Sequence, residues 1–134
     1  MNALESVTLD GDVLAYILRN GPAPEQTTYV TPDECNLQVG YVVYQAGSEI
    51  PRHMHLPVER HVIGTAEVLL VQRGRCEVDV FGPARQLVAT CKLQTGDLLI
   101  AVGGGHGFRV LEDTVLLEIK QGPYPGGGAD KERF

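Results

Sequence analysis

Glycine and proline divide this chain into short apolar segments, and this punctuation constrains the fold more than any other feature. The 134 residues include 16 glycines and 8 prolines, and no long stretch shows clean helical periodicity beside a capping residue. Short apolar runs bounded by turn residues are typical of β-strands. The segments that we predict to be strands are residues 13–18, 37–44, 67–72, 76–81, 87–92, 97–101, 108–111 and 115–119. The sequence therefore predicts an all-β protein, either a sandwich or a barrel.

The length predicts one domain spanning residues 1–134, because a single hydrophobic core suits a chain of this size. No internal repeat and no linker interrupts the sequence. Residues 122–134 are rich in glycine and proline and then charged, so we expect a coil after the last strand. Chain termini of this composition are often poorly ordered.

Charge and cysteine content exclude several classes of function. The net charge of −6 argues against nucleic acid as a partner, because phosphate binding depends on Lys and Arg. No apolar run approaches the roughly 20 residues that span a bilayer, and the first nine residues lack the basic region of a signal peptide. Cys35, Cys76 and Cys91 form no CxxC pair and are expected to be free thiols. We therefore expect a cytoplasmic protein that binds no membrane.

Two of the four histidines stand in an H-x-H pattern at His53 and His55. A strand alternates its side chains between two faces, so residues i and i+2 share one face. An H-x-H on an extended segment therefore aims two imidazoles at the same point, as a metal site on a β scaffold requires. An isolated H-x-H is also consistent with a pair of histidines that holds no metal. The choice between these two interpretations therefore depends on the surrounding residues.

The residues around this pair resemble the first motif of the cupin superfamily, G-x5-H-x-H-x3,4-E-x6-G. Here it takes the form Gly47-x5-His53-x-His55-x11-Glu67-x6-Gly74. The chain departs from this motif in one respect. Eleven residues, rather than three or four, separate His55 from Glu67.

The second cupin motif, G-x5-P-x-G-x2-H-x3-N, also has a counterpart. It takes the form Gly96-x5-Val102-x-Gly104-x-His106-x3-Val110. Valines replace the proline and the asparagine, and the histidine comes one residue early. The resemblance covers residues 47–110 directly and the strands on both sides by pattern.

Glu59 competes with Glu67 for the glutamate position, because Glu59 lies at the short family spacing from His55. The motif glycine would then fall on Ala66, and loop-like residues follow Glu59. Glu67 instead begins an apolar strand and keeps Gly74 at the motif distance. We therefore assign the position to Glu67 and interpret residues 56–66 as a loop insertion near the mouth of the barrel.

The resemblance implies a jelly-roll barrel, also called a double-stranded β-helix, that holds one divalent metal through His53, His55, Glu67 and His106. Three neutral imidazoles and one carboxylate leave a divalent ion with a residual charge near +1. An ion that prefers six ligands then keeps two adjacent coordination positions open for water, dioxygen or a chelating substrate. No cysteine lies in either motif, which argues against a thiolate site. Iron, manganese, nickel and zinc all suit this ligand set.

The implied function is a metal-dependent enzyme acting on a small polar molecule of the sugar or keto-acid type. With iron we expect a dioxygenase; with another ion we expect isomerase, epimerase or lyase chemistry, for which His61 or Glu59 could act as the base. Two alternatives stay open. One is a binding or sensing cupin with a structural metal, and the other is a metal-free nucleotide-sugar isomerase whose histidines act as acid and base.

Several residues near the motifs are candidates for substrate binding. Arg52 and Arg60 offer a guanidinium for an anionic group. Phe108 is expected to point to the same interior as His106, and Lys120 faces either the interior or the solvent.

The C-terminal segment weakly resembles that of small cupins of surface-polysaccharide and nucleotide-sugar pathways, in some of which the tail folds back beside the pocket. Tyr124 is accordingly a further candidate for contact with substrate. We expect a homodimer, because small cupins usually pair through sheet edges or exchange a strand.

Overall fold

A computed structural model describes residues 4–134, and in this part of the chain almost all regular structure is antiparallel β-sheet. The larger sheet has the order β1-β2-β8-β5-β10 and the smaller one the order β7-β6-β9. The strands of the larger sheet are β1 (Leu4–Leu9), β2 (Asp12–Leu18), β8 (Leu98–Ala101), β5 (Glu67–Arg73) and β10 (Val115–Lys120). Those of the smaller sheet are β6 (Arg75–Phe81), β7 (Leu87–Gln94) and β9 (Gly105–Val110). The all-β prediction is confirmed.

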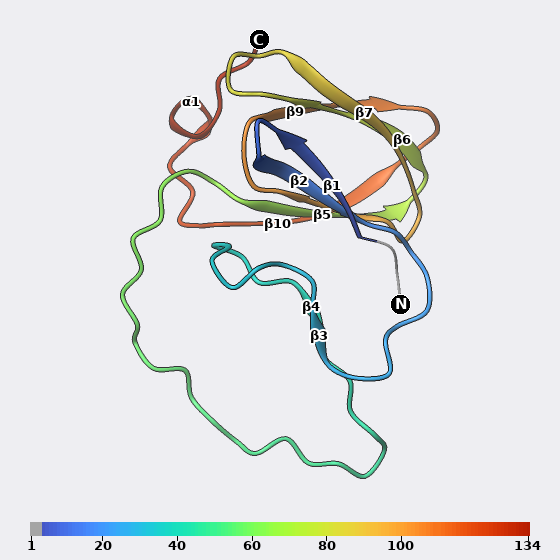
Figure 1. Ribbon diagram of the computed structural model, residues 1–134, viewed down its shortest axis with the longest axis vertical. Helices are drawn as coiled ribbons and strands as arrows, with labels where there is room; N and C mark the ends of the chain where they lie inside the picture. Colours follow the sequence, from blue (N-terminus) through green and yellow to red (C-terminus); the bar gives the residue numbers. More distant parts are fainter. Residues whose placement is uncertain (1–3) are drawn as a thin grey trace.

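The two sheets face each other and enclose the main hydrophobic core (Figure 1). Both sheets contribute to it because their strands alternate apolar residues inward. Its buried members are Val7, Leu14, Ala15, Ile17, Leu69, Val71, Cys76, Val78, Val80, Leu93 and Leu99. The molecule is therefore a two-layer β-sandwich over these strands.

A second apolar cluster covers the outer face of the larger sheet. Tyr16, Ile100 and Val68 lie side by side on β2, β8 and β5 and are buried. Residues from the segment 30–39 pack over them, carried by a two-stranded hairpin of β3 (Thr28–Tyr29) and β4 (Gly40–Tyr41). This outer cover ends before β10, where the next residue in the row, Ile119, is 57% exposed.

The turns between the strands depend on glycine at two positions that the motifs contain. Gly74, between β5 and β6, has a φ of +101°, and a Cβ there would lie 2.4 Å from the backbone oxygen of Asp113. Gly104, which precedes β9, has a φ of +61°, and a Cβ there would lie 2.0 Å from the backbone oxygen of Phe81. Side chains are excluded at both positions by sterics and by backbone conformation.

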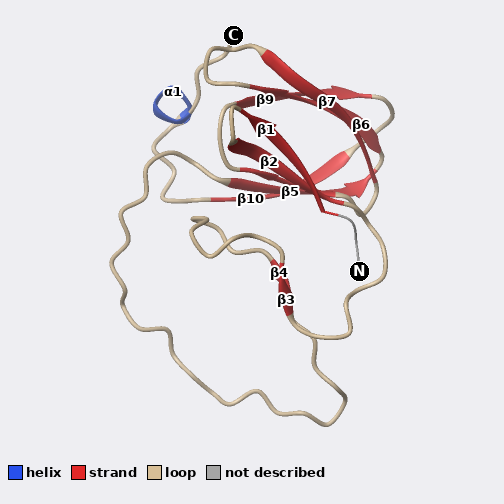
Figure 2. Cartoon of the chain, viewed as in Figure 1, coloured by secondary structure: helices blue, strands red, loops and turns tan. Residues whose placement is uncertain are grey.

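A long segment stands clear of the sandwich (Figure 2). Every residue from 44 to 65 is exposed, and none of them belongs to a helix or strand. We call residues 44–65 the arm. Backbone hydrogen bonds within the arm close short turns, such as those from Ser48 N–H to the Gln45 carbonyl and from Val58 N–H to the Leu56 carbonyl. The expected insertion at residues 56–66 is thus part of a longer irregular segment.

Seven predicted strands correspond to observed strands, with ends that differ by a few residues. The strand predicted at 37–44 is reduced to the two residues of β4, because the preceding residues serve as the outer cover. β1 and β3 were not among the predicted strands.

The C-terminal segment is also more ordered than predicted. It contains the short helix α1 (Gly127–Asp130), and Phe134 packs edge-to-face on Phe81 with ring centroids 5.1 Å apart. The expectation of a plain coil at 122–134 was therefore wrong. Within the described residues, none of the helical structure has the length and apolar character needed to cross a bilayer.

Candidate metal centre

Glu67 and His106, which are far apart in the sequence, meet at one end of the sandwich. Oε2 of Glu67 lies 3.2 Å from Nε2 of His106. Glu67 begins β5 and points inward, since it alternates with Leu69 and Val71 of the core. His106 points inward from the opposite sheet, because it is paired with buried Val80 on β6.

The environment of Glu67 suits a cation. The residue is only 7% exposed, and the contact with His106 is the ion pair or hydrogen bond that its side chain makes among the described residues. A buried carboxylate has about four lone-pair positions, and leaving them without donors is costly. A divalent ion bound by Glu67 and His106 would satisfy the remaining positions, so these two residues fit the predicted ligand roles.

His53 and His55 lie elsewhere, in the exposed arm. Their ring centroids are 5.4 Å apart in an edge-to-face arrangement. Nδ1 of His53 lies 2.9 Å from the carbonyl oxygen of Pro51, a distance that suits Nδ1–H donating and leaves Nε2 available. No group of three or more His, Cys, Asp or Glu side chains is placed to hold a metal within residues 4–134. The structure thus brings together two of the four predicted ligands as one pair and the other two as a second pair.

The arm also carries the candidates for the base and for anion binding. Glu59, His61 and Arg52 are exposed, as is Arg60, whose guanidinium lies 3.5 Å from the carbonyl oxygen of Val58. None of these four lies against the Glu67–His106 pair in this structure. Glu67, and not Glu59, is the glutamate beside His106.

A pocket of about 380 Å³ adjoins the Glu67 end of the sandwich. It lies between the end of the arm and the segment after β10, and Lys120 on its wall is paired with Glu67 across β5 and β10. The lysine Nζ lies 3.6 Å from Asp130 and 5.1 Å from the centroid of the Tyr124 ring. Asp130 also accepts a hydrogen bond from Thr65, the last residue of the arm, at 3.0 Å.

Two sequence candidates, Lys120 and Tyr124, therefore share this pocket. A third, Phe108, packs against the core, with its ring centroid 5.9 Å from that of His106. Sequence reasoning missed Asp130, although its place in the charged end of the tail was the available signal. It also missed Thr65, for which the sequence carried no signal.

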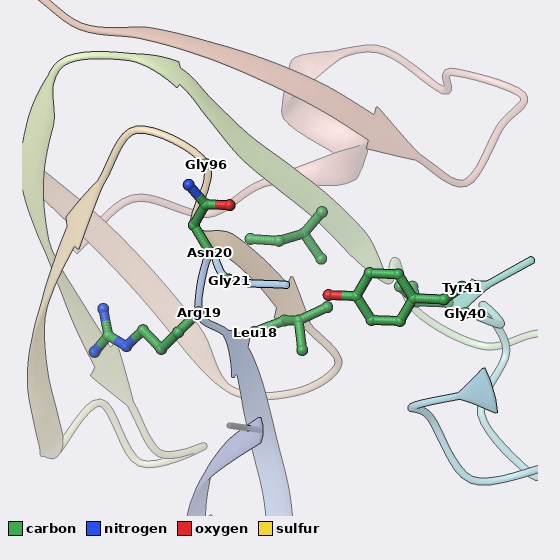
Figure 3. Close-up of a pocket in the computed structure, with 9 residues that line it drawn as sticks. Leu18, Arg19, Asn20, Gly21, Gly40, Tyr41 and Gly96 are labelled. Atoms are coloured by element: carbon green, nitrogen blue, oxygen red, sulfur yellow. The ribbon is translucent and has the colours of Figure 1, made fainter. Parts of the chain in front are cut away.

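A smaller cavity of about 260 Å³ lies at the other end of the larger sheet (Figure 3). Tyr41 points across it toward Leu18, whereas the Arg19 side chain points away. The Arg19 guanidinium instead reaches buried Asp97, 3.1 Å away, which also accepts hydrogen bonds from the backbone N–H groups of Asn20 and Gln94. Arg19, Asp97 and the two backbone N–H groups thus satisfy each other at this end of the sheet.

On the outer face of β9, Arg109 forms a bidentate ion pair with Asp79 of β6. Hydrogen bonds from Arg109 and then from Thr90 lower the pKa of the Asp79 carboxyl below its ordinary value of 3.8. This pair fastens the strand that carries His106 to its neighbour, on the face that points away from the candidate site.

Comparison of the chain with protein-family models, with curated proteins and with solved structures finds no match.

Proposed function

We propose that this chain is a small single-domain cupin that binds one divalent transition metal through His53, His55, Glu67 and His106. The ion would be iron, manganese, nickel or zinc, and the protein would be a metal-dependent enzyme acting on a small polar molecule. The observation that carries this proposal is the contact between Glu67 and His106. The two residues come from separate motifs and from opposite sheets, and they meet with the carboxylate buried.

The order of the strands supports the jelly-roll part of the proposal. From β7 onward, consecutive strands alternate between the two sheets, as β7, β8, β9 and β10 do. Crossing between two packed antiparallel sheets in this way is typical of jelly rolls.

The pocket beside Glu67 supports the choice of substrate class. Its volume suits a small molecule, and Lys120 supplies a positive charge for a carboxylate or phosphate group. Tyr124 and Asp130 add a hydroxyl and a carboxylate that can bind sugar hydroxyls or orient the lysine. A sugar acid or a keto acid combines these features.

A divalent ion at this place would supply Lewis acidity, or oxygen chemistry if it is iron. The chain's own residues then have separate tasks. Lys120 binds and orients an anionic group beside the metal ligands, and Phe108 keeps the surroundings of His106 apolar. His61 or Glu59 accepts a proton if the arm covers the pocket.

The metal site is tested by elemental analysis of protein purified without chelators. We expect about one ion per chain in the wild type. Glu67→Gln and His53→Ala should each lower metal affinity by more than about 100-fold, beyond the loss typical of an outer-shell partner. Glu59→Gln is the matched control and should keep the metal. Unchanged metal content in Glu67→Gln, or a wild type that binds none of the four ions, would refute the proposed site.

Turnover separates an enzyme from a binding module. Candidate keto acids and sugar acids are added without oxygen to iron-loaded protein, and oxygen uptake is followed on mixing with air. Parallel assays with manganese, nickel or zinc follow isomerised or cleaved products by NMR. We expect turnover that Lys120→Met reduces mainly through KM, because the lysine binds the substrate. Tight binding of these compounds without turnover under any of the ions would favour the sensing alternative.

A further inference from the structure

Among the described strands, the sandwich has four edge strands, β1, β7, β9 and β10, and two of them, β9 and β10, border the candidate site. Among the described strands, β9 is paired only with β6 and β10 only with β5. Each edge presents backbone N–H and C=O groups that an added strand could bind.

The interior is also uncovered between these two edges. Val110 of β9 shares a face with Cys76, its partner on β6, yet Val110 is 65% exposed and Cys76 is 1% exposed. On the other sheet, Glu118 of β10 is exposed whereas its partner Leu69 is buried. A wall of the sandwich is therefore missing along β9 and β10, on the side where Glu67 and His106 meet.

The arm has the sequence of the missing wall. Around the H-x-H its side chains alternate, with His53 and His55 at odd positions and Met54, Leu56 and Val58 at even positions. An extended strand with this pattern places both imidazoles on one face and the apolar residues on the other. Met54 and Leu56 are 92% and 80% exposed, so the arm carries an apolar row that no residue of the described part of the chain covers.

We infer that a second copy of this chain supplies the missing wall, so that each arm docks on β9 and β10 of the other molecule and brings His53 and His55 to its Glu67–His106 pair. The occupant is a second copy because the complementary chemistry, two imidazoles for a buried carboxylate and a third imidazole, is present in the same sequence. The inference rests on the proposed metal function and assigns that site to two chains.

Exchange in both directions is favoured over closure of the arm on its own sandwich. Most of the arm loops away from its own two sheets, and only its last residues return beside β10 (Figures 1 and 2). No described strand pairs with the free edge of β9 or of β10. Reciprocal exchange covers two arms and two open walls at once and gives a closed two-fold dimer. The exposed row of Leu117 and Ile119 on the outer face of β10 lies beside the docking edge and would be buried with it.

The decisive experiment combines two variants that each lack half of the site. One carries His53→Ala and His55→Ala in the arm, and the other carries Glu67→Gln and His106→Ala in the sandwich. The two are co-expressed with different affinity tags that contain no histidine, and heterodimers are isolated by two successive purifications. Circular dichroism and thermal melting of each parent show whether it folds.

Exchange predicts that the heterodimer has one intact site, formed by the intact arm of one chain and the intact sandwich of the other. It should bind about one zinc or nickel ion per dimer, against about two in the wild type and none in either parent. Closure within one chain predicts no binding in the heterodimer. Wild-type dimers that bind metal beside heterodimers that bind none would overturn the exchange while leaving the metal site in place.

A second measurement does not depend on metal. Light scattering after size exclusion in the presence of EDTA should give twice the 14.5 kDa mass of one chain. The variant Leu56→Asp/Val58→Asp, with charges in the apolar row, should be monomeric. Leu87→Asp, at a 58% exposed position on β7, is the matched control and should stay dimeric. A monomeric wild type, or an arm variant that remains dimeric, would overturn the exchange, whatever the result for metal.

Discussion

At the scale of single residues, the loop before His106 shows how closely the backbone is constrained near the candidate site. Gly104 combines a positive φ with a contact to the carbonyl of Phe81 that leaves no space for a methyl group. The position of His106 two residues later depends on this turn, because β9 begins at Gly105.

We predict that Gly104→Ala destabilises the fold by at least about 2 kcal/mol, from backbone strain and the contact together. That loss corresponds to a fall in Tm of roughly 5–10 °C, measurable by circular dichroism. Gly107→Ala is the control, since Gly107 lies on β9 with nothing within 4 Å of an added Cβ. Its stability should change by less than about 1 kcal/mol. Equal effects of the two substitutions would contradict the role of the turn.

Individual site residues were predictable to different degrees. The sequence singled out Glu67 by its motif distance to Gly74, and His106 by its place shortly after Gly104, one residue earlier than in the motif. The structure explains the backbone conformation of both glycines. The sequence could not place His53 and His55, because a two-residue spacing defines a shared face but not the strand that the segment pairs with. The charged end of the tail was a signal for Asp130, but its contact with Thr65 could not be predicted, because it depends on the chain folding back across more than sixty residues.

At the scale of elements, strands β6 and β9 are joined by backbone pairing and by the Asp79–Arg109 ion pair on their outer face. A carboxyl whose pKa is lower in the folded state than in the unfolded state stabilises the fold while it is ionised. This contribution is complete above the unfolded pKa, near 3.8 for Asp79, and is lost as the pH falls through the lower, folded value.

We therefore predict that Asp79→Asn lowers Tm by a nearly constant amount between roughly pH 5 and 8, where the wild-type carboxylate is ionised. The gap between variant and wild type should shrink as the pH falls below about 4. Thermal melts across this range provide the test, and Asp33→Asn, in an exposed loop, is the control. A gap that widens at acidic pH would show that the ion pair does not stabilise the fold.

The strands from β5 to β10 were predictable because each is a short apolar run bounded by glycine, proline or aspartate turns. Residues 37–44 misled the prediction because they are apolar for a different reason. Leu37 and Val39 pack over the outer face of the larger sheet as a cover rather than as part of a long strand. The local sequence pattern indicates that a residue is buried. Which part of the molecule it packs against depends on tertiary contacts.

At the scale of the whole molecule, the core between the sheets isolates Cys76 from solvent. The thiol is 1% exposed, and burial raises its pKa above the ordinary value of 9.0. Both effects suppress reaction with alkylating reagents, since the thiolate is the nucleophile. Cys35 is half-buried in the outer cover, so it lies outside this core.

We predict that iodoacetamide labels Cys76 at least about 1000-fold more slowly in the native protein than in the unfolded chain, because a stability of about 5 kcal/mol leaves fewer than one molecule in a thousand unfolded. Cys35 should be labelled sooner. Mass spectrometry of peptides from a labelling time course, with and without denaturant, measures both rates. Rapid native labelling of Cys76 would mean that the two sheets separate far more readily than this core implies.

The packing of Phe134 makes the candidate site accessible to optical measurement. Its ring lies 3.1 Å from where a Cβ on Gly105 would be, one residue before His106, and Arg85 covers it with its guanidinium 5.3 Å from the ring centroid. A small fluorophore coupled to the thiol of an Arg133→Cys variant would lie next to Phe134 in the chain. Quenching of its emission by a paramagnetic ion such as nickel would then report occupancy of the site in real time, without an assay for the reaction.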